Sequence, residues 1–185
     1  MRLNDPLVTS IEYEGQEYTI DLSFNNVLDV LEVLNNNQLF EEHKLGLIME
    51  FLIGESDLDL VAQAEIWQIV KEEYIEDKSA ANIEQDALGN IIPMRKSAQM
   101  LDIEQDAKYI YASFRQIGIN LFIEQGKMHW HEFQAILESL PEDTILQKII
   151  QIRAWKPQKS DSSVYKRQMR ELQEKYKLTN DDKNG

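Results

Sequence analysis

The chain has 185 residues, no cysteine and a formal net charge of -14 at pH 7. Its length fits one domain, or a core with a small appendage, and the lack of cysteine excludes a disulfide framework, a thiolate zinc site and a cysteine nucleophile. The negative charge disfavours direct binding to nucleic-acid backbones, which require Lys and Arg, and favours attraction to basic partners.

The sequence also bears on membranes and on compartment. No run of apolar residues is long enough to span a bilayer, and the first residues lack the apolar core of a signal peptide. We therefore expect a cytosolic protein that binds neither membrane nor nucleic acid.

Residues 1–77 predict a β-hairpin followed by helices. Strand-forming residues alternate from Val8 to Ile20, and Glu14-Gly15 lies where the turn is expected. Ser23 is then expected to cap a helix over Phe24–Leu34, which three asparagines end.

Two further helices are expected in this region. One runs from Glu41 to Ile53 and stops at Gly54. The other runs from Leu58 to Ile75 with Asp57 as its cap. Its apolar spacing predicts four buried residues, Val61, Ile66, Ile69 and Val70.

Residues 78–101 differ in character from the sequence on either side. They contain Gly, Pro and Ser and show no apolar period. We interpret them as a linker or a long surface loop, a feature that is uncommon in compact domains and often functional.

Residues 102–155 predict three capped helices that form the main core. Asp102 is the expected first N-cap, with Gln105 three residues later as in a capping box, and Gly118 is the expected stop. A second helix is expected to contain Trp130, and a third is expected to begin at Pro141. The predicted core residues are Ile103, Ala107, Ile110, Phe114, Ile117, Phe133, Leu137, Leu140, Ile149 and Ile152.

Residues 156–185 form a basic tail on an acidic protein. This segment contains 8 Lys+Arg and 5 Asp+Glu, whereas the preceding residues contain 11 and 28. An amphipathic helix is expected around Tyr165–Tyr176, and its basic face is interpreted as solvated or as a site of self-association with the acidic body. The predicted fold class is mainly α, a helical bundle with an N-terminal β-hairpin, organised as one domain.

Signs of catalysis are weak. His129-Trp130-His131-Glu132 holds metal-ligand types, but a zinc site needs three or four convergent ligands and no second cluster supplies them. No phosphate loop or nucleophile elbow occurs, and Ser113 in the middle of a helix suits close packing. We expect no catalytic residue, no metal, no cofactor and no enzymatic activity.

Five blocks of residues resemble the tail assembly chaperones of long-tailed phages and prophages of Gram-positive bacteria. The blocks are Asp106-Ala107-x-x-Ile110-Tyr111-Ala112-Ser113-Phe114, Gly118-Ile119-Asn120-Leu121, Met128-His129-Trp130-x-x-Phe133, Leu140-Pro141-Glu142-Asp143-Thr144 and Ile150-Gln151-Ile152-Arg153. The resemblance covers most of the chain and is densest from Asp102 to Arg153. The blocks are apolar and aromatic, so they mark a fold and carry no catalytic signature.

The resemblance implies a protein that coats the helix-rich tape measure protein during tail assembly in the host bacterial cytoplasm. Family members can also be made in a second, frameshifted form. The tail-tube protein is a further candidate partner. Because exposed aromatics often anchor interfaces, we take Tyr111, Trp130 and Trp155 as candidate partner contacts.

Two alternatives remain open. An acidic adaptor or nucleic-acid mimic would block a basic partner protein, but the acidic residues here are scattered among lysines. A small hydrolase would use His129 or His131 and would need a deep polar pocket beside Trp130.

Overall fold

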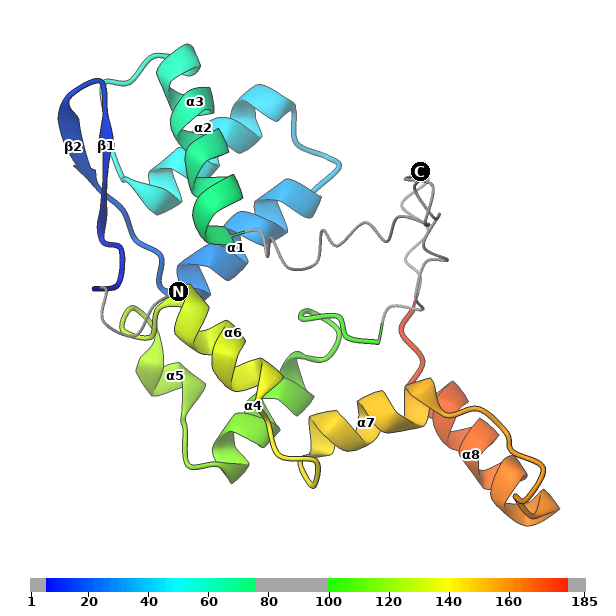
Figure 1. The fold of residues 1–185 in the computed structure, drawn as a ribbon. Helices are drawn as coiled ribbons and strands as arrows, with labels where there is room; N and C mark the ends of the chain where they lie inside the picture. Colours follow the sequence, from blue (N-terminus) through cyan, green and yellow to red (C-terminus); the bar gives the residue numbers. More distant parts are fainter. Residues whose placement is uncertain (1–5, 76–99, 180–185) are drawn as a thin grey trace, which may run out of the picture. The chain divides into compact units, whose positions relative to one another are not determined.

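The computed structural model describes residues 6–75 and 100–179, and over these residues the chain is mainly α with one two-stranded antiparallel hairpin (Figure 1). This confirms the predicted fold class. The chain divides into two compact units. Unit 1 comprises Met1–Asn82 with Phe122–Ile136, and unit 2 comprises Ile83–Leu121 with Leu137–Gly185. The predicted linker at 78–101 lies outside the described residues except for Met100 and Leu101.

Unit 1 begins with the predicted hairpin. Strand β1 (Ser10–Tyr13) pairs with β2 (Gln16–Thr19), and the register sets Tyr13 opposite Gln16. The two turn residues, Glu14 and Gly15, both have positive φ, 50° and 78°. That conformation is required by a type I′ turn, whose twist matches that of the flanking strands.

Three helices follow in unit 1. They are α1 (Phe24–Asn35), α2 (Glu41–Leu52) and α3 (Leu60–Val70), and a single π-helical turn, η1 (Lys71–Ile75), extends α3. The N-cap of α3 is Asp59 rather than the predicted Asp57, since the Asp59 Oδ1 accepts a 2.9 Å hydrogen bond from the Ala62 amide. α1 packs on α2, and α2 packs on α3.

A stack of aromatic rings completes the core of unit 1. The rings of Phe24 and Phe133 lie 5.1 Å apart and nearly parallel, and Trp130 stacks on Phe133 at 5.6 Å. Phe133 and Trp130 belong to α6 (Trp130–Glu138), which follows the short helix α5 (Leu121–Glu124). Residues 102–153, where the resemblance is densest, therefore belong to both units, because 122–136 lie in unit 1 and the residues on either side lie in unit 2.

Unit 2 contains α4 (Ala107–Gln116), α7 (Ile145–Ala154) and α8 (Ser163–Lys175). Both α4 and α8 pack on α7. Gly118, with φ of 91°, follows α4 as the sequence predicts. Left-handed backbone at this position is the usual conformation of a glycine that terminates a helix.

Two helix starts in unit 2 lie later than predicted. The segment 103–106 forms turns before α4, although the Asp102 carboxylate does accept the Gln105 amide, as in the expected capping box. Pro141 begins a turn instead of a helix, and its carbonyl accepts both the amide and the hydroxyl of Thr144. Thr144 stands at the N-cap position of α7, and its side chain makes no capping hydrogen bond to that helix.

Most predicted core residues are buried, but not all. Ile103 and Ile152 are half-buried, whereas Ala107 and Ile117 are exposed and do not belong to the core. Ala107 begins α4 and Ile117 lies just beyond its end, so neither projects from the inner face of the helix. The buried members are Ile110, Phe114, Phe133, Leu137, Leu140 and Ile149.

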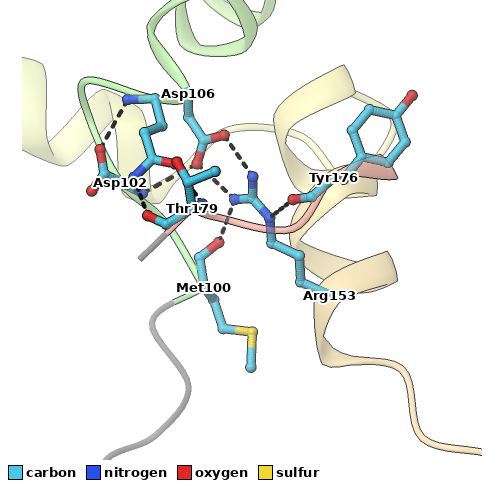
Figure 2. A network of polar contacts seen from close by, with 7 residues as sticks. Met100, Asp102, Asp106, Arg153, Tyr176 and Thr179 are labelled. Carbon is cyan, nitrogen blue, oxygen red and sulfur yellow. Dashed lines mark hydrogen bonds and ion pairs between the residues drawn. The ribbon is translucent and has the colours of Figure 1, made fainter. Parts of the chain in front are cut away.

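A buried ion pair joins distant segments of unit 2 (Figure 2). The Arg153 guanidinium donates two hydrogen bonds to the Asp106 carboxylate, at 2.6 and 2.7 Å. It also donates to the main-chain carbonyls of Met100 and Tyr176, at 2.8 and 2.7 Å. One side chain at the end of α7 therefore holds the segment before α4 and the segment after α8.

A neighbouring polar group extends this network. The Gln105 side chain accepts from the amide and hydroxyl of Thr179 and donates to its carbonyl. The Asp102 amide donates to Asp106 at 3.1 Å. The chain after α8 is therefore bonded back to the turns that precede α4.

Candidate partner-binding surface

Trp130 is not a surface contact. It is 3% exposed, stacks on Phe133, and donates its indole N–H to the carbonyl of Ile75 at 3.4 Å. The expectation that it binds a partner is therefore corrected. A buried Trp usually has a partner for its N–H, and here the partner is the carbonyl oxygen of Ile75, the last residue of η1. No local pattern in the sequence could indicate this contact, because the two residues are far apart in the chain.

The other two candidate aromatics lie in unit 2. Tyr111 on α4 is half-buried. Trp155 directly follows α7 and is also half-buried, with its ring edge-to-face against Tyr165 of α8 at 6.0 Å. Tyr165 and its neighbour Val164 are exposed, so Trp155 lies next to accessible apolar surface at the start of α8.

The largest departure from the sequence prediction is on α3. Except for Gln63, Glu65 and Gln68, every residue of this helix is apolar. Its inner side is buried through Ile66 and Val70, as predicted, but Val61 and Ile69, predicted to be core, are exposed. A helix that is apolar on all sides is normally buried on all sides, and this one is not.

We call the exposed side of this helix the α3 outer face, defined by Leu60, Val61, Ala64, Glu65 and Ile69. All five residues are exposed, with Leu60 at 56% and Val61 at 65%. In the described parts of the chain, no segment covers these two side chains. The sequence did contain a signal for this face, because α3 has too many apolar residues for a single buried stripe.

Acidic groups surround the α3 outer face. From Glu55 to Ile75 the chain has six acidic residues and one basic residue. Glu65 is held in place by the hairpin, since the Tyr13 hydroxyl donates to its Oε2 at 2.5 Å. This hydrogen bond is the main cause, and burial a smaller one, of a pKa for Tyr13 that is raised to about 12. Tyr13 therefore stays a neutral donor at physiological pH.

Other large apolar side chains are exposed elsewhere on unit 1. Phe40, at 76%, precedes α2 and meets His43 edge-on. Phe122 and Ile123 lie on α5 and are exposed. Singly exposed apolar residues are normal on protein surfaces, so a continuous helix face is the stronger indication of binding.

In the histidine cluster, His129 is buried, His131 is half-buried and Glu132 is exposed. His129 and His131 stack at 5.2 Å, and the His129 Nδ1 accepts the His131 amide. Burial lowers the pKa of both histidines, and for His129 it outweighs the nearby carboxylates of Asp21 and Glu132. Among the described residues, no group of three or more His, Cys, Asp or Glu side chains is placed to hold a metal ion.

Ser113 has a structural role in unit 2. It is fully buried, and its hydroxyl accepts the amide of Leu146 at 3.1 Å. Leu146 is in the first turn of α7, where backbone amides have no partner within the helix. The serine therefore satisfies a helix terminus, a role beyond the close packing expected from the sequence.

Within residues 6–75 and 100–179, no helix is long and apolar enough to cross a bilayer. The fold and surface define a mainly α, acidic protein that exposes a row of apolar side chains along α3. A family described as Bacteriophage Gp15 protein matches residues 3–178, so the chain belongs to this bacteriophage family. No curated protein and no solved structure matches the chain.

Proposed function

We propose that the protein is a phage tail assembly chaperone that binds helical segments of the tape measure protein and keeps it soluble until the tail tube assembles. Membership in a bacteriophage family supports the phage setting. The resemblance of the segment 102–153 to tail assembly chaperones supplies the particular role. In this proposal the protein acts in the host bacterial cytoplasm and is not an enzyme.

The observation that carries the proposal is apolar surface displayed by a highly charged protein. The α3 outer face is accessible, while the net charge of -14 favours solubility. A long helix-rich partner has apolar stripes that would aggregate in water, and a helix laid against an apolar surface covers such a stripe. The charge then limits association of the complexes with one another.

Co-expression tests the proposal. The tape measure protein of the same phage should be insoluble alone and soluble with this protein, and the two should copurify. An acidic protein of similar size and charge, unrelated in sequence, is the control for a general effect of charge on solubility. If that control works equally well, or if the tape measure protein stays insoluble, the proposal fails.

Tyr111 and Trp155 remain proposed contacts within unit 2. Substituting either by Ala should weaken copurification more than reversing a single exposed charge on the body, because apolar burial contributes most of the affinity at such interfaces. Binding to the tail-tube protein and self-association are further proposals. In the absence of the tape measure protein, copurification with the tail-tube protein tests the first, and copurification of two differently tagged copies of this chain tests the second.

A further inference from the structure

The α3 outer face has two adjoining rows of side chains. Val61, Glu65 and Ile69 are four residues apart and form one row, and Leu60, Ala64 and Gln68 form the next. Apolar atoms dominate the first turns of the face. Glu65 interrupts the apolar row at its centre, and Gln68 continues toward Glu72, to which its amide donates.

The smallest side chain on this face lies between two larger ones. Ala64 is exposed and is flanked by Leu60 and Gln68 in its own row. The distance of closest approach between two packed helices is set by the side chains at their contact, and is about 8–10 Å between axes. Ala64 therefore marks a low point where the backbone of a second helix can cross α3.

The carboxylates near the α3 outer face determine which charges a partner helix should carry. Tyr13 fixes the Glu65 carboxylate on the face. Asp59 is the N-cap residue of α3, and Glu72 lies in η1, just beyond its other end. Carboxylates so close to an interface repel acidic partners and attract Lys or Arg. A partner helix thus needs an apolar stripe for Leu60, Val61 and Ile69 and a basic edge beside that stripe.

We propose that the α3 outer face is the docking site for an amphipathic partner helix with a basic edge, which crosses α3 at Ala64. This inference rests on the proposed function, in which the partner is helical. It adds the location of the site, the polarity of the partner segment and the selectivity role of Glu65. Apolar contacts supply most of the affinity, and the carboxylates supply rate and selectivity.

Two synthetic peptides test the chemistry. Both are amphipathic helices with the same leucine stripe, and one carries lysines and the other glutamates along the edge of that stripe. The protein should bind the lysine-edged peptide at least about tenfold more tightly, a difference of about 1.4 kcal/mol. Glu65→Gln should reduce this preference, since it removes the fixed charge while retaining the size of the side chain.

A matched pair of variants tests the location. Ala64→Arg places a long basic side chain at the crossing point and should weaken binding of the lysine-edged peptide by about tenfold or more. Ala135→Arg is the control, because Ala135 is also an exposed alanine on a helix of unit 1. Equal binding by the two variants would overturn the proposal.

Because the chain has no cysteine, a single introduced thiol reports on accessibility. The thiol of Val61→Cys should react readily in the free protein and be protected by the lysine-edged peptide, whereas that of Ala135→Cys should be unaffected. Protection in the free protein at every concentration would mean that the chain covers its own face. Protection that grows with protein concentration would mean that a second copy is the occupant. Either result overturns the proposal.

The inference and the proposed function can fail separately. If Ala64→Arg still keeps the tape measure protein soluble, the docking site lies elsewhere and the chaperone proposal stands. If the unsubstituted protein binds the lysine-edged peptide at α3 but does not solubilise the tape measure protein, the docking site stands with another helical partner.

Discussion

Asp106 illustrates how one residue acquires a role that its sequence position does not suggest. Its place near a helix start suggests only that its negative charge is stabilised by the helix dipole. In the structure the side chain is 1% exposed and forms a bidentate pair with Arg153, 47 positions away. A buried pair of this kind contributes little net stability compared with apolar residues, but removing one partner leaves an uncompensated charge.

Arg153→Met should therefore lower the free energy of unfolding by about 3–5 kcal/mol, because Asp106 would remain buried without its counter-ion. Adding Asp106→Leu to that variant should recover part of the loss. Urea unfolding of the two single variants and the double variant measures the coupling between the residues.

The exposed pair of Arg167 and Glu171 is the control for this cycle, with its charged atoms 3.9 Å apart. Arg167→Met should cost less than about 1 kcal/mol, as is typical of surface pairs. If Arg153→Met costs no more than this control, the network of Figure 2 does not hold unit 2 together.

His129 links stability to pH. Burial lowers its pKa, so the folded protein takes up its proton only at lower pH than the unfolded chain, whose histidines titrate near pH 6.5. Stability should be retained above about pH 6.5 and fall as the pH drops below it, because the unfolded chain then binds more protons.

The measurement is urea unfolding at about pH 7.5 and about pH 5.5. His129→Gln should reduce the loss of stability between these values, and His43→Gln, at an exposed position, should not. A pH dependence that is the same in the two variants would show that His129 is not its source.

At the scale of single elements, the hairpin shows how two residues determine a register. Glu14 adopts a φ of 50°, which is unfavourable for a residue with a Cβ atom. Asn tolerates this conformation better than Glu. Glu14→Asn should raise the free energy of unfolding by up to about 1 kcal/mol, part of the roughly 1–2 kcal/mol that left-handed backbone costs a residue with a Cβ atom.

Chemical denaturation of three variants tests this. Glu12→Gln, an exposed site on β1, accounts for the loss of one negative charge. Gly15→Ala should be destabilising, because φ at Gly15 is 78°. A stabilisation by Glu14→Asn no larger than that of Glu12→Gln would indicate that turn conformation is not the cause.

The sequence also predicted most helices of this chain, and the places where a predicted helix start was wrong are informative. The capping pattern predicted a start at Asp102, yet α4 begins at Ala107. The capping bond from Gln105 to Asp102 is present, but Arg153 captures Asp106, and the residues before α4 form turns. The local capping bond is therefore present, although the regular helix begins later than the pattern predicted.

At the scale of the whole molecule, the net charge affects the rate of association with a charged partner. With a charge of -14, association with a basic-edged helix should be accelerated at low ionic strength. The attraction between exposed charges separated by more than the Debye length is largely screened, and that length falls from about 10 Å at 0.1 M salt to about 3 Å at 1 M.

Raising the salt concentration over this range should slow association with the tape measure protein without dissolving the complex, because apolar burial is not screened. Stopped-flow association rates and gel filtration at the two salt concentrations separate the two effects. A complex that dissociates at high salt would instead favour the alternative of an acidic protein that mimics nucleic acid.

The sequence by itself determined the class of fold, the hairpin with its turn, and the approximate extent of most helices. These features depend on contacts between residues close together in the chain, such as apolar residues at helical spacing and the Glu14-Gly15 turn. Only the tertiary structure decided which side of each element is covered. Trp130 is buried because Phe133 and the carbonyl of Ile75 surround it, whereas Val61 is exposed because no described segment lies over it. Periodicity identifies an apolar face, but burial depends on neighbours contributed by distant parts of the chain.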